Sequence, residues 1–350
     1  MNLSEFIRCL PKCDLHVHLD GSLRESTFYE LADSCGHSVA ESPFKESYCS
    51  LNDYLATFAH TCAVLGTADA IRRVSYELCV DAFSEGVYYQ EIRFAPQLLE
   101  SHTLTAIDAI AAVADGVGDA EKKFNLDSQQ PGLYRAAIIV CAMRSPESLS
   151  SRSIDAAHLA IEARDKFAYP VVGFDLAGAE KNNSAKAHAA AFSVAADAGL
   201  GITVHAGEDD GPHSIADAIN SCHAQRIGHG VALVDDLKLA TAIVESNITL
   251  EVCLTSNFQT MPQLQARESH PLGRLLEMGV PVSLATDNRL VSSTTLSAEY
   301  GLAADLFSLN QEQLHKISMQ GFGAMFYPGS LSEANKYLAA ITSVADTSLS

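Results

Sequence analysis

The chain has 350 residues, 47% of them hydrophobic, which is enough for a well-packed core, and a formal net charge of −20. No run of Lys or Arg offers a stripe for phosphates, so neither nucleic acid nor an anionic membrane is expected as a partner. The nine cysteines include no C-x-x-C pair, which argues against a zinc site built from cysteines.

The cellular compartment is predicted from the same features. The first residues lack the apolar run of a signal peptide, and no apolar stretch of about 18 residues could span a membrane. The excess of acidic residues is explained by the solubility that a high net charge gives a protein. We therefore expect a cytoplasmic protein with reduced thiols, of undetermined oligomeric state.

Eight short apolar segments recur along the chain and are predicted to be strands. Several are β-branched and almost continuously apolar, which is typical of strands buried on both faces. The eight segments are Lys12–His18, Val87–Phe94, Tyr134–Ala142, Val171–Leu176, Ile202–His205, Arg226–Gly228, Ile248–Cys253 and Val282–Ala285.

Helix-like stretches separate most of these strands. Examples are Ala68–Glu85, Ala106–Phe124, Ala185–Ala198 and Leu237–Glu245. The alternation indicates parallel βα units, and eight of them predict an α/β fold of the (β/α)8 TIM-barrel type. We expect residues 1–350 to form one domain, with a helical insertion after the first strand and extra helices at the C-terminal end.

The predicted insertion runs from Gly21 to Gly86 and contains at least three helix-like pieces. In a barrel, an insertion after the first strand overhangs the mouth where active sites lie. Leu51, Tyr54, Leu55 and Phe58 are spaced i, i+3, i+4 and i+7, which predicts one face of a helix over residues 50–58. Ordinary core packing would explain this pattern equally well.

His16 and His18 lie two residues apart in the first predicted strand. Side chains at this spacing point to the same side of a strand, so both imidazoles can face one point at the barrel mouth. Because the chain has 13 histidines, chance explains the pair as readily as a metal site does.

The same placement recurs at three further strand ends. His205 follows the fifth strand, His229 the sixth and Asp287 the eighth. Chance is a poor explanation for polar groups at four strand ends, since those ends converge in a barrel. Three imidazoles and a carboxylate would suit zinc or a similar divalent ion.

Two further residues stand close to these strand ends. Glu208, three residues after His205, could return over the metal and exchange protons with a substrate. From its position alone, however, it is better explained as an acidic residue at a helix N-terminus. Gly178 could present its main-chain N–H to a ligand, because no side chain blocks the approach.

The sequence resembles the adenosine deaminase family of the amidohydrolase superfamily. The matching stretches occur in family order from about Leu10 to the last helices, and the ordered set is highly specific. They are Asp14–Ser22, Glu91–Pro96, Asp175–Glu180, Val204–Glu208, Arg226–Gly230, Leu250–Cys253 and Ser283–Asn288.

The resemblance implies a ligand set and a reaction. His16, His18, His205 and Asp287 would hold one Zn²⁺ ion per chain, with water or hydroxide completing the shell. Zinc lowers the pKa of such a water to about 7. The implied reaction is hydrolytic deamination of adenosine and 2′-deoxyadenosine to inosine and deoxyinosine with release of ammonia, a step of purine salvage.

The resemblance also assigns roles around the purine. Glu208 would protonate N1, after which hydroxide, oriented by His229 and Asp287, adds to C6. The main chain at Gly178 would donate to N3, and Asp20 would accept from the ribose hydroxyl. His18 and Asn288 would border the nucleoside, and Leu51, Tyr54, Leu55 and Phe58 would form a mobile apolar gate.

Two positions bear on the substrate. Asp20 favours a nucleoside, since relatives that act on free adenine tend to carry Glu there. Asn288 departs from the family, because many members carry a second Asp there; an amide could donate directly to purine N7.

Other functions are also consistent with the sequence. A sibling deaminase would act on adenine, an adenylated metabolite or an N6-modified adenine nucleotide. A barrel that has lost catalysis would serve as a binding protein, although all ligand candidates and Glu208 are present. An amide or phosphoester hydrolase is disfavoured, because no Lys at a strand end could bridge two metals.

Overall fold

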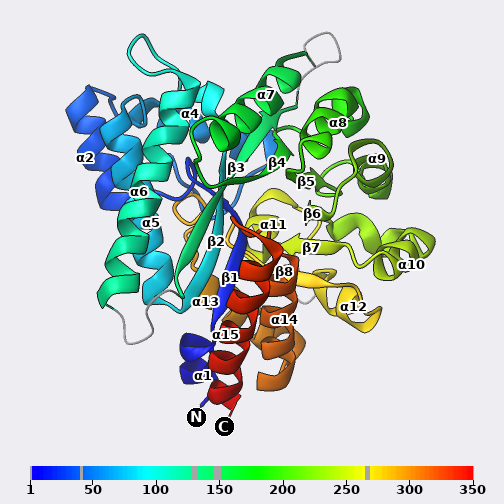
Figure 1. Ribbon diagram of the computed structural model, residues 1–350. Coiled ribbons are helices and arrows are strands. Elements are labelled where there is room, and N and C mark those ends of the chain that lie inside the picture. Colours follow the sequence, from blue (N-terminus) through cyan, green and yellow to red (C-terminus); the bar gives the residue numbers. More distant parts are fainter. Residues whose placement is uncertain (1, 40–41, 128–132, 145–150, 265–268, 350) are drawn as a thin grey trace.

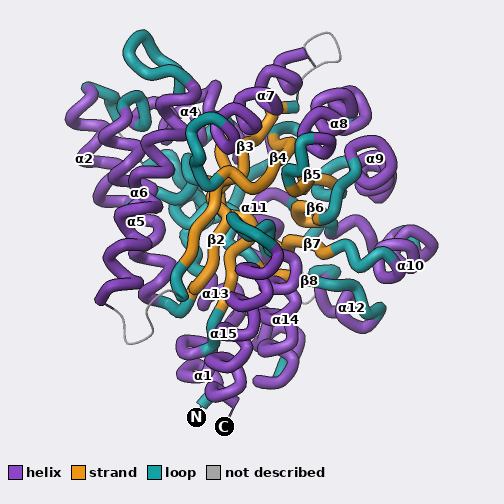
Figure 2. The backbone as a smooth tube through the Cα atoms, viewed as in Figure 1, coloured by secondary structure: helices purple, strands orange, loops and turns teal. Residues whose placement is uncertain are grey.

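A computed structural model describes residues 2–39, 42–127, 133–144, 151–264 and 269–349. Its eight strands pair in parallel in sequence order, and they lie at the centre of the molecule in Figure 2. All eight expected strands are present, with bounds that differ by at most one residue. They are β1 Lys12–His18, β2 Val87–Phe94, β3 Arg135–Met143, β4 Val171–Ala177, β5 Gly201–Ala206, β6 Arg226–His229, β7 Thr249–Val252 and β8 Val282–Leu284.

The sheet closes on itself where β1 meets the end of β8. His18 N donates to Asp287 O at 2.7 Å, and Asp287 N donates to His16 O at 2.8 Å. This closure, with helices around the strands, makes the fold a (β/α)8 TIM barrel, as expected. Because the strands are parallel, their carboxyl ends meet at one mouth.

Helices surround the strands in Figure 1. Among the described residues they are α1 Leu3–Cys9, α2 Glu25–Cys35, α3 Leu51–Leu55, α4 Phe58–Val64, α5 Ala68–Ser84, α6 Ala106–Asp127, α7 Ser151–Asp165, α8 Ala189–Asp197, α9 Pro212–Cys222, α10 Leu237–Glu245, α11 Leu254–Thr260, α12 Leu272–Glu277, α13 Leu296–Phe307, α14 Gln311–Ala324 and α15 Leu331–Leu349. Helices α2 to α5 form the expected insertion, and α14 and α15 are the expected extra C-terminal helices.

One predicted helix is wrong as a continuous element. The helix expected over residues 50–58 ends at Leu55, and α4 begins only at Phe58. Between them the main-chain hydrogen bonds tighten to the i+3 pattern, with Thr57 N donating to Tyr54 O and His60 N to Thr57 O, each at 3.1 Å. This tighter turn separates the two helices.

A register shift in β1 lets that strand serve two layers of the barrel interior. The shift lies between Asp14 and Val17. Leu15 and His16 both lie within this shift: Leu15 packs with Phe322 of α14 and Tyr337 of α15, whereas His16 faces the other potential ligands. An irregularity of this kind re-aims side chains towards a site.

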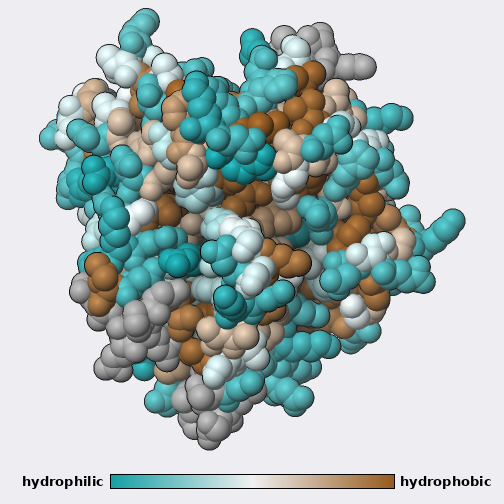
Figure 3. Space-filling model, in the orientation of Figure 1, coloured by the Kyte–Doolittle hydropathy of each residue, from teal (hydrophilic) through white to brown (hydrophobic). Residues whose placement is uncertain are grey.

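The outer surface suits the acidic composition. The face drawn in Figure 3 is predominantly hydrophilic, with apolar groups gathered mainly in its hollows. Within the described part of the chain, no helix is long and apolar enough to cross a membrane.

Candidate active site

Four potential metal ligands meet at the barrel mouth. His16 and His18 come from β1, His205 from β5 and Asp287 from the turn after β8. One ligand atom from each lies within 4.8 Å of every other. His16 Nε2 and His18 Nε2 lie 3.3 and 3.4 Å from Asp287 Oδ1, and His18 Nε2 lies 3.1 Å from His205 Nε2.

The hydrogen bonds behind these rings leave lone pairs aimed at one point. His16 Nδ1 donates to Glu251 Oε2 at 2.9 Å, so in the neutral ring the lone pair lies on the buried Nε2, which makes no hydrogen bond. His205 Nδ1 donates to Asp175 Oδ2 at 3.0 Å, which makes its Nε2 an acceptor as well. Imidazole lone pairs facing a carboxylate oxygen fit a divalent cation, and carboxylates behind ligating histidines are typical of metal sites.

A layer of buried ion pairs supports the ligands. Arg93 donates to Asp175 Oδ2 at 2.9 Å and to Glu251 Oε2 at 2.8 Å. Arg226 Nε donates to Glu251 Oε1 at 2.7 Å. Although burial alone would raise it, the two guanidinium groups hold the pKa of Glu251 well below its usual range. Both carboxylates therefore remain charged acceptors for the metal-facing histidines.

Sequence reasoning gave Asp175, Glu251 and Arg93 no role. A signal was present, because each is a charged residue inside an apolar strand, and a charge buried in a strand must be paired. The sequence did not reveal which charges pair, since the partners lie on β2, β4, β6 and β7.

Glu208 lies beside the ligand cluster and is buried. Thr260 Oγ1 donates to its Oε1 at 2.8 Å, and its Oε2 lies 3.5 Å from His229 Nε2. Burial, together with the negative charge of Asp287, raises the pKa of Glu208 to about 8. A carboxyl in this environment holds a proton at neutral pH and can deliver it to a bound base.

The main chain that carries Glu208 is fixed by a carboxylate that sequence reasoning also left without a role. Glu180 accepts from three consecutive main-chain amides, those of Gly207 at 2.5 Å, Glu208 at 2.9 Å and Asp209 at 2.6 Å. Gly207 has φ +73°, so successive N–H groups can turn towards one anion. A glutamate after a strand gives no sequence signal for this contact.

A cavity of about 370 Å³ opens onto these groups. A volume near the lower end of the usual range of about 300–1,000 Å³ suits a small ligand. The cavity brings together all the residues that the sequence proposed for metal, proton transfer and substrate, apart from the buried His16. Those that line it are His18, Asp20, Leu51, Tyr54, Leu55, Phe58, Gly178, His205, Glu208, His229, Asp287 and Asn288.

Two of the predicted substrate contacts, Asp20 and Gly178, line this cavity. Asp20 Oδ1 is buried without a partner, while Oδ2 lies 3.7 Å from Cys62 Sγ. Gly178 has φ +101°, which favours glycine, and a Cβ there would meet Met143 Cε at 3.1 Å. The Asp20 acceptor is therefore available to a ligand, and position 178 requires glycine because of its main-chain conformation and the nearby Met143.

Asn288 lines the cavity, but its amide already has a partner. Its Nδ2 donates to Tyr54 Oη at 2.8 Å, whereas its Oδ1 is buried without a partner, over Gly21. Tyr54 Oη also lies 2.9 Å from Ser292 Oγ. Direct donation from the Asn288 amide to a purine would require this contact with Tyr54 to be released.

The segment proposed as a gate forms one wall of the cavity from two helices. Leu51 and Tyr54 on α3 are buried, whereas Leu55 and Phe58 are partly exposed. All four pack with Tyr48 and Val291 as a separate apolar cluster. The wall therefore combines buried packing with side chains that a ligand could contact.

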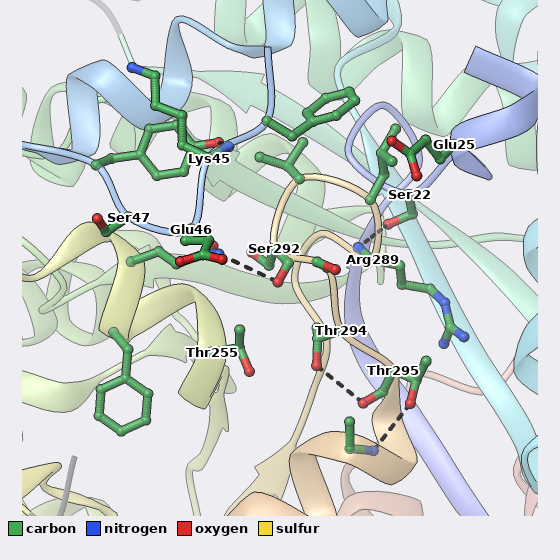
Figure 4. Close-up of a pocket in the computed structure, with 18 of the residues that line it drawn as sticks. Ser22, Glu25, Lys45, Glu46, Ser47, Thr255, Arg289, Ser292, Thr294 and Thr295 are labelled. Carbon is green, nitrogen blue, oxygen red and sulfur yellow. Dashed lines mark hydrogen bonds between the residues drawn. The ribbon is translucent and has the colours of Figure 1, made fainter. Parts of the chain in front are cut away.

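Figure 4 shows a larger cleft, of about 1330 Å³, that is lined by other residues. The residues that line it include Ser22, Lys45, Thr255 and Arg289, but none of the proposed metal ligands. Among the described residues, its three cations already have partners, since Arg24 pairs with Asp81, Lys45 with Asp53 and Arg289 with Glu85. The smaller cavity is therefore the candidate active site.

Comparison with known proteins places this geometry in a family. A family model described as adenosine deaminase matches residues 11–339. An adenosine deaminase of Mycobacteroides abscessus is 35% identical over 339 residues, which cover 91% of each chain. A probable adenosine deaminase of Dictyostelium discoideum is 39% identical over 92% of this chain, which spans 41% of that relative's length.

A solved structure agrees over nearly the whole fold. The apo N6-methyl-AMP deaminase from Arabidopsis thaliana has a TM-score of 0.83 and 26% sequence identity, covering 98% of this chain and 99% of that one. Relatives of this fold therefore carry names that refer to different adenine-containing substrates.

Proposed function

The chain belongs to the adenosine deaminase family, and from this premise we propose that it hydrolyses adenosine and 2′-deoxyadenosine to inosine, deoxyinosine and ammonia. The convergence of four potential metal ligands with Glu208 on one cavity carries the proposal. We further propose that residues 1–350 act as one domain and that the protein is cytoplasmic, since its nine free cysteines suit a reducing compartment.

In this proposal His16, His18, His205 and Asp287 hold one zinc ion. When bound, zinc acidifies water and so supplies a nucleophile near neutral pH. Glu208 holds the proton that is delivered to purine N1, which makes C6 electrophilic. His229 and Asp287 orient the attacking oxygen, and the main-chain N–H of Gly178 meets N3.

A nucleoside is favoured over a nucleotide by the charges around the cavity. Arg144 is the sole cationic side chain among the described residues that line it, and its Nη1 and Nη2 already donate to the main-chain oxygens of Asn183 and His205. Asp20 would meet a 5′-phosphate with a like charge. We therefore propose adenosine rather than AMP or N6-methyl-AMP as the substrate.

Assays on a panel of substrates test this function through Asp20. We expect kcat/KM for adenosine to exceed that for adenine about 5- to 150-fold, because an unpaired buried carboxylate costs about 1–3 kcal/mol without the ribose hydroxyl. The ultraviolet change on deamination measures both rates. Asp20→Ala should shrink this ratio, since it removes the acceptor.

The same panel identifies the competing functions. Higher kcat/KM for adenine or for N6-methyl-AMP than for adenosine would replace our proposal with the corresponding sibling activity. Metal-loaded protein that turns over none of these substrates would contradict it altogether.

The gate is tested by Phe58→Ala. We propose that the wall formed by Leu51, Tyr54, Leu55 and Phe58 closes on the nucleoside and excludes water. The variant should raise the KM for adenosine about tenfold, which corresponds to about 1.4 kcal/mol of lost apolar contact. Steady-state kinetics and metal content measure the effect.

Phe167→Ala is the control, because that phenylalanine is 40% exposed and does not line the cavity. If Phe58→Ala instead lowers the melting temperature sharply and the folded fraction keeps wild-type kinetics, Phe58 is a packing residue and the gate is wrong.

A further inference from the structure

A chain of hydrogen bonds that starts at a main-chain amide leads to His229. Leu272 N donates to His270 Nδ1 at 3.1 Å, and a main-chain amide can only donate. Burial lowers the pKa of His270 to about 3, so the ring is neutral and carries one proton. With Nδ1 accepting, that proton lies on Nε2, 3.3 Å from Asn257 Oδ1.

The direction continues through Asn257. Its oxygen accepts from His270, so its amide nitrogen faces the other way, with Nδ2 3.2 Å from His229 Nδ1. An amide nitrogen can only donate, and His229 Nδ1 must therefore accept. A ring whose Nδ1 accepts carries its single proton on the other nitrogen, so the His229 proton lies on Nε2. That nitrogen is 3.5 Å from Glu208 Oε2, on the cavity side.

The opposite tautomer, with the His229 proton on Nδ1, is inconsistent with the first hydrogen bond of this series. A proton on His229 Nδ1 would require the Asn257 amide to be reversed and His270 to carry its proton on Nδ1. Two N–H groups would then face each other at Leu272. All four residues are 0–3% exposed, so two buried N–H groups would be left without an acceptor.

We propose that Asn257 and His270 are positioning residues that hold His229 in the tautomer with its proton on Nε2. His229 then meets the reacting centre as a hydrogen-bond donor. The consequence for catalysis rests on the proposed function: His229 steadies the oxygen that attacks C6, but it cannot remove a proton from that oxygen. That task remains with a carboxylate, and Asp287 lies in the same cavity.

Nitrogen NMR reads the tautomer directly. In metal-loaded protein with 15N-labelled histidine, two-bond proton–nitrogen couplings distinguish a protonated Nε2 from a protonated Nδ1, and His229→Gln and His270→Gln assign the signals. We expect both rings of the wild-type protein to carry the proton on Nε2. A wild-type His229 protonated on Nδ1 would overturn the proposal without any measurement of activity.

Asn257→Asp tests the link to catalysis. A carboxylate still accepts from His270 but can no longer donate to His229, so the His229 proton should move to Nδ1. We expect kcat to fall on the order of 10²- to 10⁴-fold, since a wrong histidine tautomer costs about 10⁴-fold in serine proteases. KM and metal content should stay near their wild-type values.

Asn125→Asp is the matched control. Asn125 pairs with the main chain of Tyr134 at the end of α6, away from the site, so this variant should change stability at most. If Asn257→Asp moves the proton and kcat is unchanged, the proposed role in catalysis is wrong. If the wild-type protein does not deaminate adenosine, the proposed function falls, while the NMR result still decides the tautomer.

Discussion

Glu208→Gln should lower kcat for adenosine about 10²- to 10⁴-fold while the bound metal is retained. The amide keeps the size of the side chain and can still accept from Thr260, which lies 2.8 Å from Glu208 Oε1. It cannot deliver a proton to purine N1. None of the four proposed ligands is altered, so elemental analysis should find the same metal content in the variant and the wild-type protein.

The pH dependence gives a second signature of Glu208. The raised pKa of about 8 means that the carboxyl holds its proton at neutral pH and loses it as the pH rises. Wild-type kcat/KM should therefore fall on the alkaline side. The residual activity of Glu208→Gln should lack this fall, because the amide does not titrate there.

Glu121→Gln is the control for removal of a partly buried charge. Glu121 accepts from the main-chain amide of Ala136 at 3.0 Å and does not line the cavity, so its amide variant should keep wild-type kcat. Near-normal turnover by a metal-loaded Glu208→Gln protein would remove Glu208 from the mechanism.

The barrel and the gathering of the site were accessible to sequence reasoning, because both follow from periodicity. Buried parallel strands show as apolar runs, and polar residues directly after those runs meet at one mouth. The spacing of His16 and His18 in β1 predicts that their side chains lie on one side. Their contact with His205 could be predicted only by assuming that the strands close into a barrel.

Contacts that depend on main-chain geometry could not be predicted from the sequence. His229 has φ +61° and Asp287 has φ +58°, which are uncommon values for residues other than glycine. Glu180 binds three main-chain amides, and the order of donors from Leu272 to His229 depends on which atoms face each other. No pattern of residue types encodes such directions.

The break between α3 and α4 shows a related limit. The apolar spacing from Leu51 to Phe58 is the same whether the chain forms one helix or two, because both keep these side chains on one cavity wall. The i+3 hydrogen bonds donated by Thr57 and His60 depend on the local main-chain conformation, which the apolar spacing does not determine. The spacing therefore predicted the shared wall and missed the turn within it.

His205→Ala should lose most of the bound metal and with it the deaminase activity. The variant removes one of four ligands and leaves Asp175 without its histidine donor, 3.0 Å away in the wild-type protein. Asp175→Asn keeps the ligand but weakens the group that orients it, so its affinity for zinc should fall by the smaller factor of about 10- to 100-fold.

His229→Ala is the informative comparison, because a second arrangement of ligands is geometrically possible. His229, Cys253 and Asp287 also bring ligand atoms within 4.8 Å of one another. If these residues held the metal, His229→Ala and Cys253→Ser would empty the site while His205→Ala kept it filled. We expect His205→Ala to lose the metal, and His229→Ala and Cys253→Ser to keep it. His229→Ala should nevertheless lose activity.

The positions of the ring lone pairs favour His16, and not His229, as a metal ligand. His229 Nδ1 faces the Asn257 amide at 3.2 Å, and its Nε2 carries a proton in our assignment, so neither nitrogen is free to bind a cation. His16 Nε2, by contrast, is buried, makes no hydrogen bond and lies 3.3 Å from Asp287 Oδ1. Elemental analysis of His205→Ala, His229→Ala and Cys253→Ser beside the wild-type protein separates the two sets; metal retained by His205→Ala and lost from His229→Ala would refute both the ligand assignment and the tautomer on which it depends.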